Sequence, residues 1–200
     1  MFIQVITAKV VDEDALWRQV DRWESEIRPG AEGFLGSTSG ITDDGRLIVL
    51  ARFESEEDAR RNSERPEQGA WWAEMEKTLA DPKFQDSVEV DVMGAGGSND
   101  AGFVQVMRGH VVDAAKLAGL RARMKEFEAA MSEMRPDVLG DVTAIHGDGT
   151  FTDTVYFRSE AEARTNEAKE MPEEMQAMFA EWMSAATIDE YLDLKRPRLA

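Results

Sequence analysis

The sequence contains no cysteine and only two histidines, His110 and His146. Without cysteine the chain can form no disulfide, no thiol nucleophile and no cysteine-ligated iron–sulfur cluster. Zinc and non-haem iron sites depend largely on histidine and cysteine ligands, so we expect no metal site.

Long apolar runs are also missing. No stretch approaches the roughly 20 apolar residues that a helix needs to span a bilayer. The first residues, Met1 to Ile6, read as a strand and lack the basic region of a signal peptide. We therefore expect a cytoplasmic protein with no membrane partner.

Basic residues are outnumbered, because 23 Lys and Arg stand against 40 Asp and Glu and give a formal net charge of -17. Nucleic-acid binding needs a basic face, and the basic cluster here is the short segment from Lys195 to Arg198. We expect no nucleic-acid partner, and the acidic surface is typical of a protein kept soluble by its charge.

The sequence does contain an internal repeat. Leu47 to Asn62 is an apolar run followed by Ser55, acidic residues and Ala-Arg-x-Asn, and Thr154 to Asn166 repeats it around Ser159. The pattern is typical of a strand that leads into a helix whose first turn is capped by the serine. With 200 residues, the repeat favours two domains of about 100 residues over one large one.

Each copy is predicted to have the order βαββαβ, the ferredoxin-like arrangement. In the first copy we expect strands at 2–10, 33–41, 46–54 and 84–93, a helix at 13–27 and a helix at 55–79 that is interrupted near Pro66. In the second copy the first helix is longer and reaches Met134, and the last strand covers 187–194. The glycine-rich segment predicts a linker, so we assign domains to 1–93 and 102–200 with a linker at 94–101.

A βαββαβ unit carries both helices on one sheet face and leaves the other bare. We therefore predict an α+β chain whose two antiparallel sheets pack face to face, as in a barrel formed by two subunits. If Val49, Ala51 and Phe53 lie under the helices, alternation places their neighbours on the bare face. The residues expected there are Ile48, Leu50 and Arg52 with Phe2, Gln4 and Ile6 or their neighbours in register, and Thr152, Thr154 and Tyr156 with Phe103, Gln105 and Met107.

Two motifs and this element order carry a resemblance to a known family. Arg28 to Gly36 reads Arg-Pro-Gly-x-x-Gly-Phe-Leu-Gly, and Phe53 to Arg60 reads Phe-x-Ser-x-x-x-Ala-Arg. In these motifs and this order the chain resembles the antibiotic biosynthesis monooxygenase family of the dimeric α/β-barrel superfamily. The resemblance covers essentially the whole chain, once in each copy. Members of that family are usually homodimers, so the tandem copy resembles a fused dimer. The resemblance implies either a monomeric pseudo-dimer or a homodimer.

The resemblance also implies a chemistry. The family includes small oxygenases that use no metal or flavin and oxidise a polycyclic phenol directly with dioxygen. It therefore implies a monooxygenase-like protein without a cofactor that acts on or binds a small aromatic, polyketide-like molecule. Such a site needs an apolar wall and donors for an oxyanion, for which Asn62, Trp71 and Trp72 are the candidate catalytic residues.

The candidate substrate-binding residues are Arg52, Gln4, Gln105, Tyr156 and Asn166. Asn166 has no tryptophan partners at the positions that match Trp71 and Trp72, so we expect the pocket in the first copy.

A non-catalytic binding or scaffolding protein is the alternative. No histidine lies near Asn62 in the sequence, and arginine is a poor proton acceptor, so no base is evident. Asn62 can be a local helix cap, and of the adjacent Trp71 and Trp72 one is expected in the core and the other at a rim. The haem-degrading branch of the family uses a histidine on the second helix, where neither histidine of this chain falls.

Overall fold

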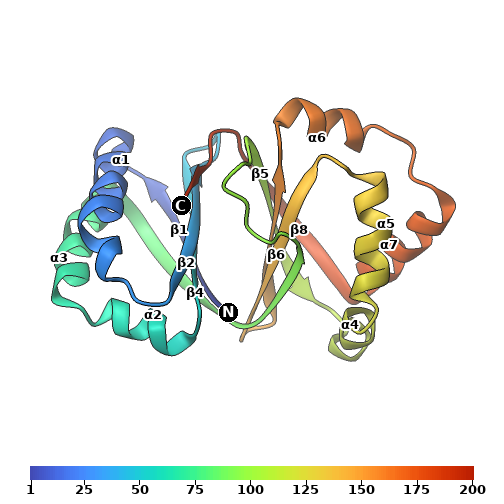
Figure 1. The fold of residues 1–200 in the computed structure, drawn as a ribbon, viewed down its shortest axis with the longest axis horizontal. Coiled ribbons are helices and arrows are strands. Elements are labelled where there is room, and N and C mark those ends of the chain that lie inside the picture. Colours follow the sequence, from blue (N-terminus) through green and yellow to red (C-terminus); the bar gives the residue numbers. More distant parts are fainter. The chain divides into compact units, whose positions relative to one another are not determined.

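The computed structural model describes residues 1–200 with the exception of Ala130 and Glu174. The chain forms two compact units, which we call unit 1 (residues 1–90 and 196–200) and unit 2 (residues 91–195). Each unit is a sheet with helices on one face (Figure 1). The sequence predicts the repeats at 1–93 and 102–200, whereas the contacts divide the chain after residue 90 and assign the C-terminal residues to unit 1.

Unit 1 has the predicted order βαββαβ. Its strands are β1 (Phe2–Val10), β2 (Phe34–Ile41), β3 (Arg46–Phe53) and β4 (Leu79–Gly94). Its helices are α1 (Glu13–Arg22), α2 (Glu56–Ser63) and α3 (Pro66–Met75), with a π-helical turn at Trp23–Ile27 and 3-10 turns at Arg28–Gly30 and Glu76–Thr78. The predicted interruption near Pro66 is confirmed, because the proline starts α3, where a first-turn residue needs no N–H. The last strand begins earlier than predicted, at Leu79.

The sheet of unit 1 has the order β4-β1-β3-β2-β9 and is antiparallel. Strand β9 (Arg198–Leu199) pairs with β2, and the Ser37 N–H donates to the Ala200 carbonyl at 2.8 Å. These bonds explain why the C-terminal residues belong to unit 1. A two-residue strand has no periodicity, so the sequence did not indicate it.

Unit 2 repeats the order of unit 1 with four strands, β5 (Phe103–Val111), β6 (Val138–His146), β7 (Thr150–Phe157) and β8 (Ala186–Leu194). Its helices are α4 (Ala114–Arg121), α5 (Met124–Met134), α6 (Glu160–Glu167) and α7 (Glu173–Ala185). The sheet order is β8-β5-β7-β6, and the end of β4 lies next to β6. The long helix predicted before Met134 is two helices, because a turn at Ala122 and Arg123 separates α4 from α5.

Strand register decides which residues of β1 share a face with Arg52. The predicted phase of β3 is right, because Val49 and Ala51 lie with the helices and Arg52 points to the bare face. Gln4 pairs directly with Ala51, and directly paired residues share a face. Gln4 therefore lies under the helices and not with Arg52, which is paired with Ile3.

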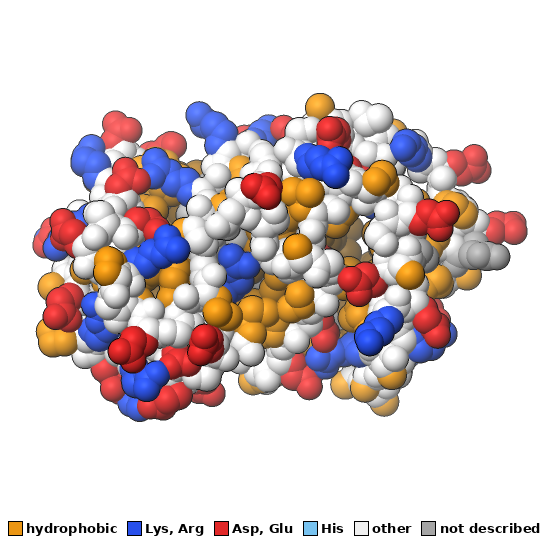
Figure 2. Space-filling model, in the orientation of Figure 1, with side chains coloured by type: hydrophobic (Ala, Val, Ile, Leu, Met, Phe, Trp, Pro, Cys, Tyr) orange, Lys and Arg blue, Asp and Glu red, His pale blue; other side chains and the backbone are white. Residues whose placement is uncertain are grey.

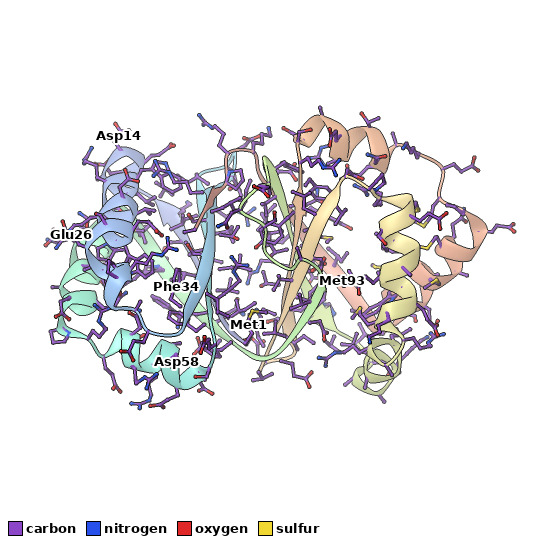
Figure 3. The ribbon with its side chains drawn as sticks, viewed as in Figure 1. Met1, Asp14, Glu26, Phe34, Asp58 and Met93 are labelled. Carbon is purple, nitrogen blue, oxygen red and sulfur yellow. The ribbon has the colours of Figure 1, made fainter. Side chains whose placement is uncertain are left out.

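The predicted serine caps are present. The Ser55 hydroxyl accepts from the Asp58 N–H at 3.1 Å, and Ser159 accepts from the Glu162 N–H at 3.3 Å. Asp58, labelled in Figure 3, also accepts a hydrogen bond from the Ser55 hydroxyl at 2.5 Å and forms an ion pair with Arg61. Hydrogen bonds from Ser55 and the charge of Arg61 lower the pKa of Asp58.

Charge is mixed over the helical surface of unit 1, where acidic and basic side chains alternate instead of forming one patch (Figure 2). Many of these charges pair along one helix, as Arg22 does with Glu26 at 2.8 Å and Arg60 with Glu57 at 2.6 Å. Exposed pairs of this kind add little stability. No helix in the described part of the chain is long and apolar enough to cross a membrane.

Candidate functional site

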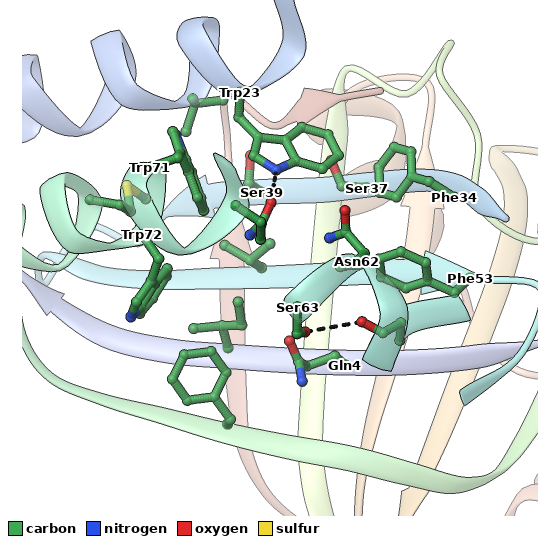
Figure 4. Close-up of a pocket in the computed structure, with 18 of the residues that line it drawn as sticks. Gln4, Trp23, Phe34, Ser37, Ser39, Phe53, Asn62, Ser63, Trp71 and Trp72 are labelled. Carbon is green, nitrogen blue, oxygen red and sulfur yellow. Dashed lines mark hydrogen bonds between the residues drawn. The ribbon is translucent and has the colours of Figure 1, made fainter. Parts of the chain in front are cut away.

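Unit 1 contains a cavity of about 370 Å³ between its sheet and its helices. Its walls are mainly aromatic and aliphatic, with amide and hydroxyl groups among them (Figure 4). The polar residues that line it are Gln4, Glu24, Ser37, Ser39, Asn62, Ser63 and Gln68. The aromatic ones are Trp23, Phe34, Phe53, Trp71, Trp72 and Phe84.

The tryptophan side chains are fixed by hydrogen bonds and ring contacts. The Trp71 indole N–H donates to the Gln19 carbonyl at 2.8 Å, and the Trp23 N–H donates to Gln68 Oε1 at 2.8 Å. Trp72 packs edge to face with Phe84, with ring centroids 5.1 Å apart. Trp71 is buried and Trp72 is partly buried, as expected for one core and one rim residue, yet both line the cavity. They give flat apolar walls, but neither the Trp23 nor the Trp71 N–H is available to a ligand.

Asn62 is held in a defined orientation at the end of α2. Its side chain is buried, and its Oδ1 accepts from Arg65 Nη1 at 3.0 Å. The same Arg65 nitrogen donates to the Ile27 carbonyl at 3.1 Å, which ties α2 to the turn after α1. With Oδ1 engaged, the Nδ2 amide has no acceptor among the described residues and lies in the cavity lining on the side of Asn62 away from the Phe34 and Phe53 rings (Figure 4). It is the donor that a bound oxygen atom would meet.

Trp23 and Phe34 also line the cavity, although the sequence did not indicate them as site residues. Their rings meet edge to face with centroids 4.8 Å apart, and Phe34 lies on the helix side of β2 (Figure 3). Trp23 opens the π-helical turn, a local widening of the helix that often occurs at functional sites. The only sequence signal for it was its place in the apolar stripe of the first helix, which indicates burial but not a cavity.

The cavity wall includes one charged group, Glu24. It is the one titratable side chain among the described residues that line the cavity, and Arg28 binds its carboxylate at 2.6 Å. Gln4, on the floor of the cavity, donates to Asp86 Oδ1 at 2.9 Å. Among the described residues, no group of three or more His, Asp and Glu side chains could hold a metal ion.

Four of the predicted site residues lie outside this cavity. Arg52 is buried on the opposite sheet face, where its Nε has no partner. Tyr156 is fully buried on the corresponding face of unit 2. Gln105 donates to Asp193 at 3.1 Å, and Asn166 lies partly buried on α6 with its amide bonded to the Glu162 carbonyl at 2.9 Å. The cavity of unit 1 therefore brings together Asn62, Trp71, Trp72 and Gln4.

No protein family matches the chain by sequence, and neither does any curated protein. Among solved structures, it resembles a "putative monooxygenase" from Lactobacillus acidophilus NCFM, with a TM-score of 0.74 at 14% identity over 100% of this chain and 95% of that one. A protein described in the same words from Fusobacterium nucleatum has a TM-score of 0.70 at 9% identity, over 99% and 93% of the two chains. An anthrone oxidase-like protein has a TM-score of 0.64 at 11% identity, over 100% and 93%. These neighbours confirm the predicted resemblance at the level of the fold.

Proposed function

We propose that unit 1 binds a small planar aromatic molecule in its cavity and oxidises it with dioxygen without a cofactor. The observation that carries the proposal is the Asn62 amide, which points into an aromatic cavity with a free donor and a fixed orientation. The volume of about 370 Å³ falls within the usual range of about 300 to 1,000 Å³ for small-molecule pockets.

The role of Asn62 follows from the charge that such a reaction develops. An anthrone-type ketone loses a proton to give an electron-rich enolate, and the Nδ2 amide donates a hydrogen bond to the enolate oxygen. Because Arg65 holds Oδ1, the donor does not need to reorient when the charge forms. Trp23, Trp71 and Trp72 hold the ring system and exclude water around it.

The reaction balances without an external reductant. The reacting CH2 carbon of the substrate forms a bond to one oxygen atom and becomes a carbonyl, while both of its C–H bonds and the O–O bond break. The second oxygen atom leaves as water. All the electrons that reduce dioxygen come from the substrate.

Binding without turnover is the second candidate function. Glu24 is the only carboxylate among the described residues that line the cavity, its partner Arg28 is 2.6 Å away, and no histidine lines it. A cavity with a free amide donor but no free base fits a binding protein as well as an enzyme that leaves proton removal to water.

The test compares Asn62→Asp with Asn166→Asp. The first substitution keeps an oxygen for Arg65 but removes the amide donor. The second changes the asparagine at the matching position of unit 2, which lies outside the cavity. The similar fold of an anthrone oxidase-like protein suggests anthrone as the probe. Oxygen uptake and anthraquinone formation are measured with each variant, and anthrone binding is followed by quenching of tryptophan fluorescence.

We expect the wild type and Asn166→Asp to take up oxygen equally, and Asn62→Asp to be slower by about 10²-fold, the usual loss when one oxyanion donor is removed. Quenching without uptake by the wild type would favour the binding protein. Absence of both would contradict the proposal.

A further inference from the structure

Unit 2 has its own cavity, of about 160 Å³, on the helix side of its sheet. Its walls are built from β4, β5, β6, β7 and β8 below and from α4, α5 and α7 above, and Met93 at the end of β4 (Figure 3) is one of them. The apolar lining is rich in methionine and aromatic rings: Met93, Met107, Met124, Met183, Phe127, Phe151, Phe179 and Trp182. An apolar cavity of about 150 Å³ is large enough to hold benzene.

Two aspartates share the floor of this cavity. Asp141 lies on β6 and Asp153 on β7, where Asp153 pairs in register with Thr143, two residues from Asp141 on the same face. Thr143 Oγ1 donates to Asp153 Oδ1 at 2.9 Å. Asp141 is 5% exposed, which places a carboxyl group deep inside the unit.

The charge of the pair follows from its surroundings. Burial raises the pKa of Asp141 well above its usual range, and the neighbouring Asp153 raises it further. Burial also raises the pKa of Asp153. The two carboxyl groups therefore hold a shared proton to higher pH than isolated aspartates and then carry one negative charge between them.

One other charged group lines the cavity in the described part of the chain. Asp91 on β4 receives two hydrogen bonds from Arg121 on α4, at 2.9 and 2.7 Å, and so has a counter-ion of its own. The side chains that α5, α7, β5 and β8 add to the lining are uncharged. The negative charge of the aspartate pair thus has no cation next to it in the cavity.

Unit 1 shows that the fold does not require these acids. The strand positions that match Asp141 and Asp153 are Ser37 and Val49, which line the cavity of unit 1 on the same face of an equivalent pair of strands. Burying carboxylates without a counter-ion lowers stability, so a chain that only needed this sheet would gain by having serine and valine.

We propose that the cavity of unit 2 is a binding site for a small organic cation, an aliphatic or benzylic ammonium ion. The ammonium group lies on Asp141 and Asp153 in place of their shared proton, and the hydrocarbon part lies among the methionines and rings. Phe127 and Trp182, with centroids 5.6 Å apart, offer the ring faces to which ammonium ions bind. The carboxylates repel an anion, and the surrounding side chains do not supply the six or more oxygen ligands that calcium or magnesium prefers.

The test is calorimetric titration of the full chain with benzylammonium chloride, with benzyl alcohol as the uncharged probe of the same shape. We expect benzylammonium to bind at least tenfold more tightly than benzyl alcohol at pH 7. Titrations in two buffers of different ionisation enthalpy should show proton release on binding. Affinity should fall as the pH is lowered, because protons compete for the aspartate pair.

Two variants and one control sharpen the test. Asp141→Ser with Asp153→Val installs the residues of unit 1 and should lower benzylammonium affinity at least tenfold while benzyl alcohol still binds. Asp141→Asn alone keeps one carboxylate, so it should bind the cation without releasing a proton. Asp189→Asn removes an exposed carboxylate of the same unit and should change nothing.

Several outcomes would overturn the proposal: equal binding of the two probes, no loss in the double variant, or a calcium titration that gives heat where benzylammonium gives none. Thermal unfolding of each variant separates lost binding from lost folding. Asn62 of unit 1 does not line this cavity, so the proposals for the two cavities are tested independently of each other.

Discussion

Unit 1 and unit 2 share one fold, but their cavities are lined by different kinds of side chain. Both have βαββαβ order, antiparallel sheets of the same strand order and serine caps at the same helix. Yet unit 1 encloses about 370 Å³ lined with tryptophans and amides, and unit 2 encloses about 160 Å³ lined with methionines and carboxyl groups. The framework therefore does not determine the character of the cavity.

The difference arises largely from the helices. In unit 1 the first helix ends in a π-helical turn that presents Trp23 to the cavity. In unit 2 the corresponding stretch is divided into α4 and α5, and α5 places Met124 and Phe127 in the space. The polar groups differ as well: in unit 2 they lie on strands, as Asp141 does, whereas in unit 1 they come from strands and helices, as Ser37 and Asn62 do.

The largest expected effect is a difference in stability loss when matching leucines of the two cores are shortened. Leu16 of α1 is fully buried, while its counterpart Leu117 of α4 lies against the cavity of unit 2. Leu16→Ala should lower the free energy of unfolding by about 3 to 5 kcal/mol, and Leu117→Ala by nearer about 2 kcal/mol, because the second side chain has fewer packed neighbours to lose. Urea unfolding of both variants measures the two values. Equal losses would show that the cavity beside Leu117 is closed in solution.

The next effect concerns pH and the two kinds of buried acid. The raised pKa values of Asp141 and Asp153 mean that the folded chain keeps protons that the unfolded chain loses near pH 4. Their contribution to stability is therefore lost as the pH rises from about 4 through the folded pKa values. The lowered pKa of Asp58 in unit 1 acts in the opposite sense, since its contribution is present above the usual pKa and is lost as the pH falls.

Asp141→Ser with Asp153→Val should remove the first of these trends. We expect the free energy of unfolding at pH 7 to rise by about 1 to 4 kcal/mol, as when buried charges are replaced by well-packed side chains. The dependence of thermal stability on pH between about 4 and 7 should flatten. An unchanged profile would mean that the pair titrates normally in the folded chain, and Asp189→Asn serves as the control.

The smallest effect compares the two serine caps. Ser55→Ala and Ser159→Ala should each lower the free energy of unfolding by about 1 kcal/mol. The loss should be larger for Ser55, which bonds both the N–H and the carboxylate of Asp58, than for Ser159, whose bond to the Glu162 N–H is 3.3 Å long. Thermal unfolding of the two variants measures the difference, and the reverse order would show that the Asp58 contact adds nothing.

Part of the candidate site was visible in the sequence. Asn62, Trp71 and Trp72 follow a recognisable strand-to-helix pattern, and the structure brings them to one cavity. Whether Gln4 or its neighbours shared a face with Arg52 was left open, because alternation gives two faces without saying which one the helices cover. Only the pairing of Gln4 with Ala51 decides it. Arg52 was expected on the bare face and lies there, outside the cavity.

The sequence by itself determined what depends on short stretches of chain. The repeat, the order of strands and helices, the break at Pro66 and the serine caps all follow from residues close together in the chain, where local backbone preferences and side-chain bonds act. The tertiary structure alone decided the rest. Asp141 meets Asp153 because β6 pairs with β7 in one register, and Arg65 orients Asn62 because the turn after α1 offers it a carbonyl. Such contacts depend on how separate elements pack, and packing sums many weak interactions that no local pattern records.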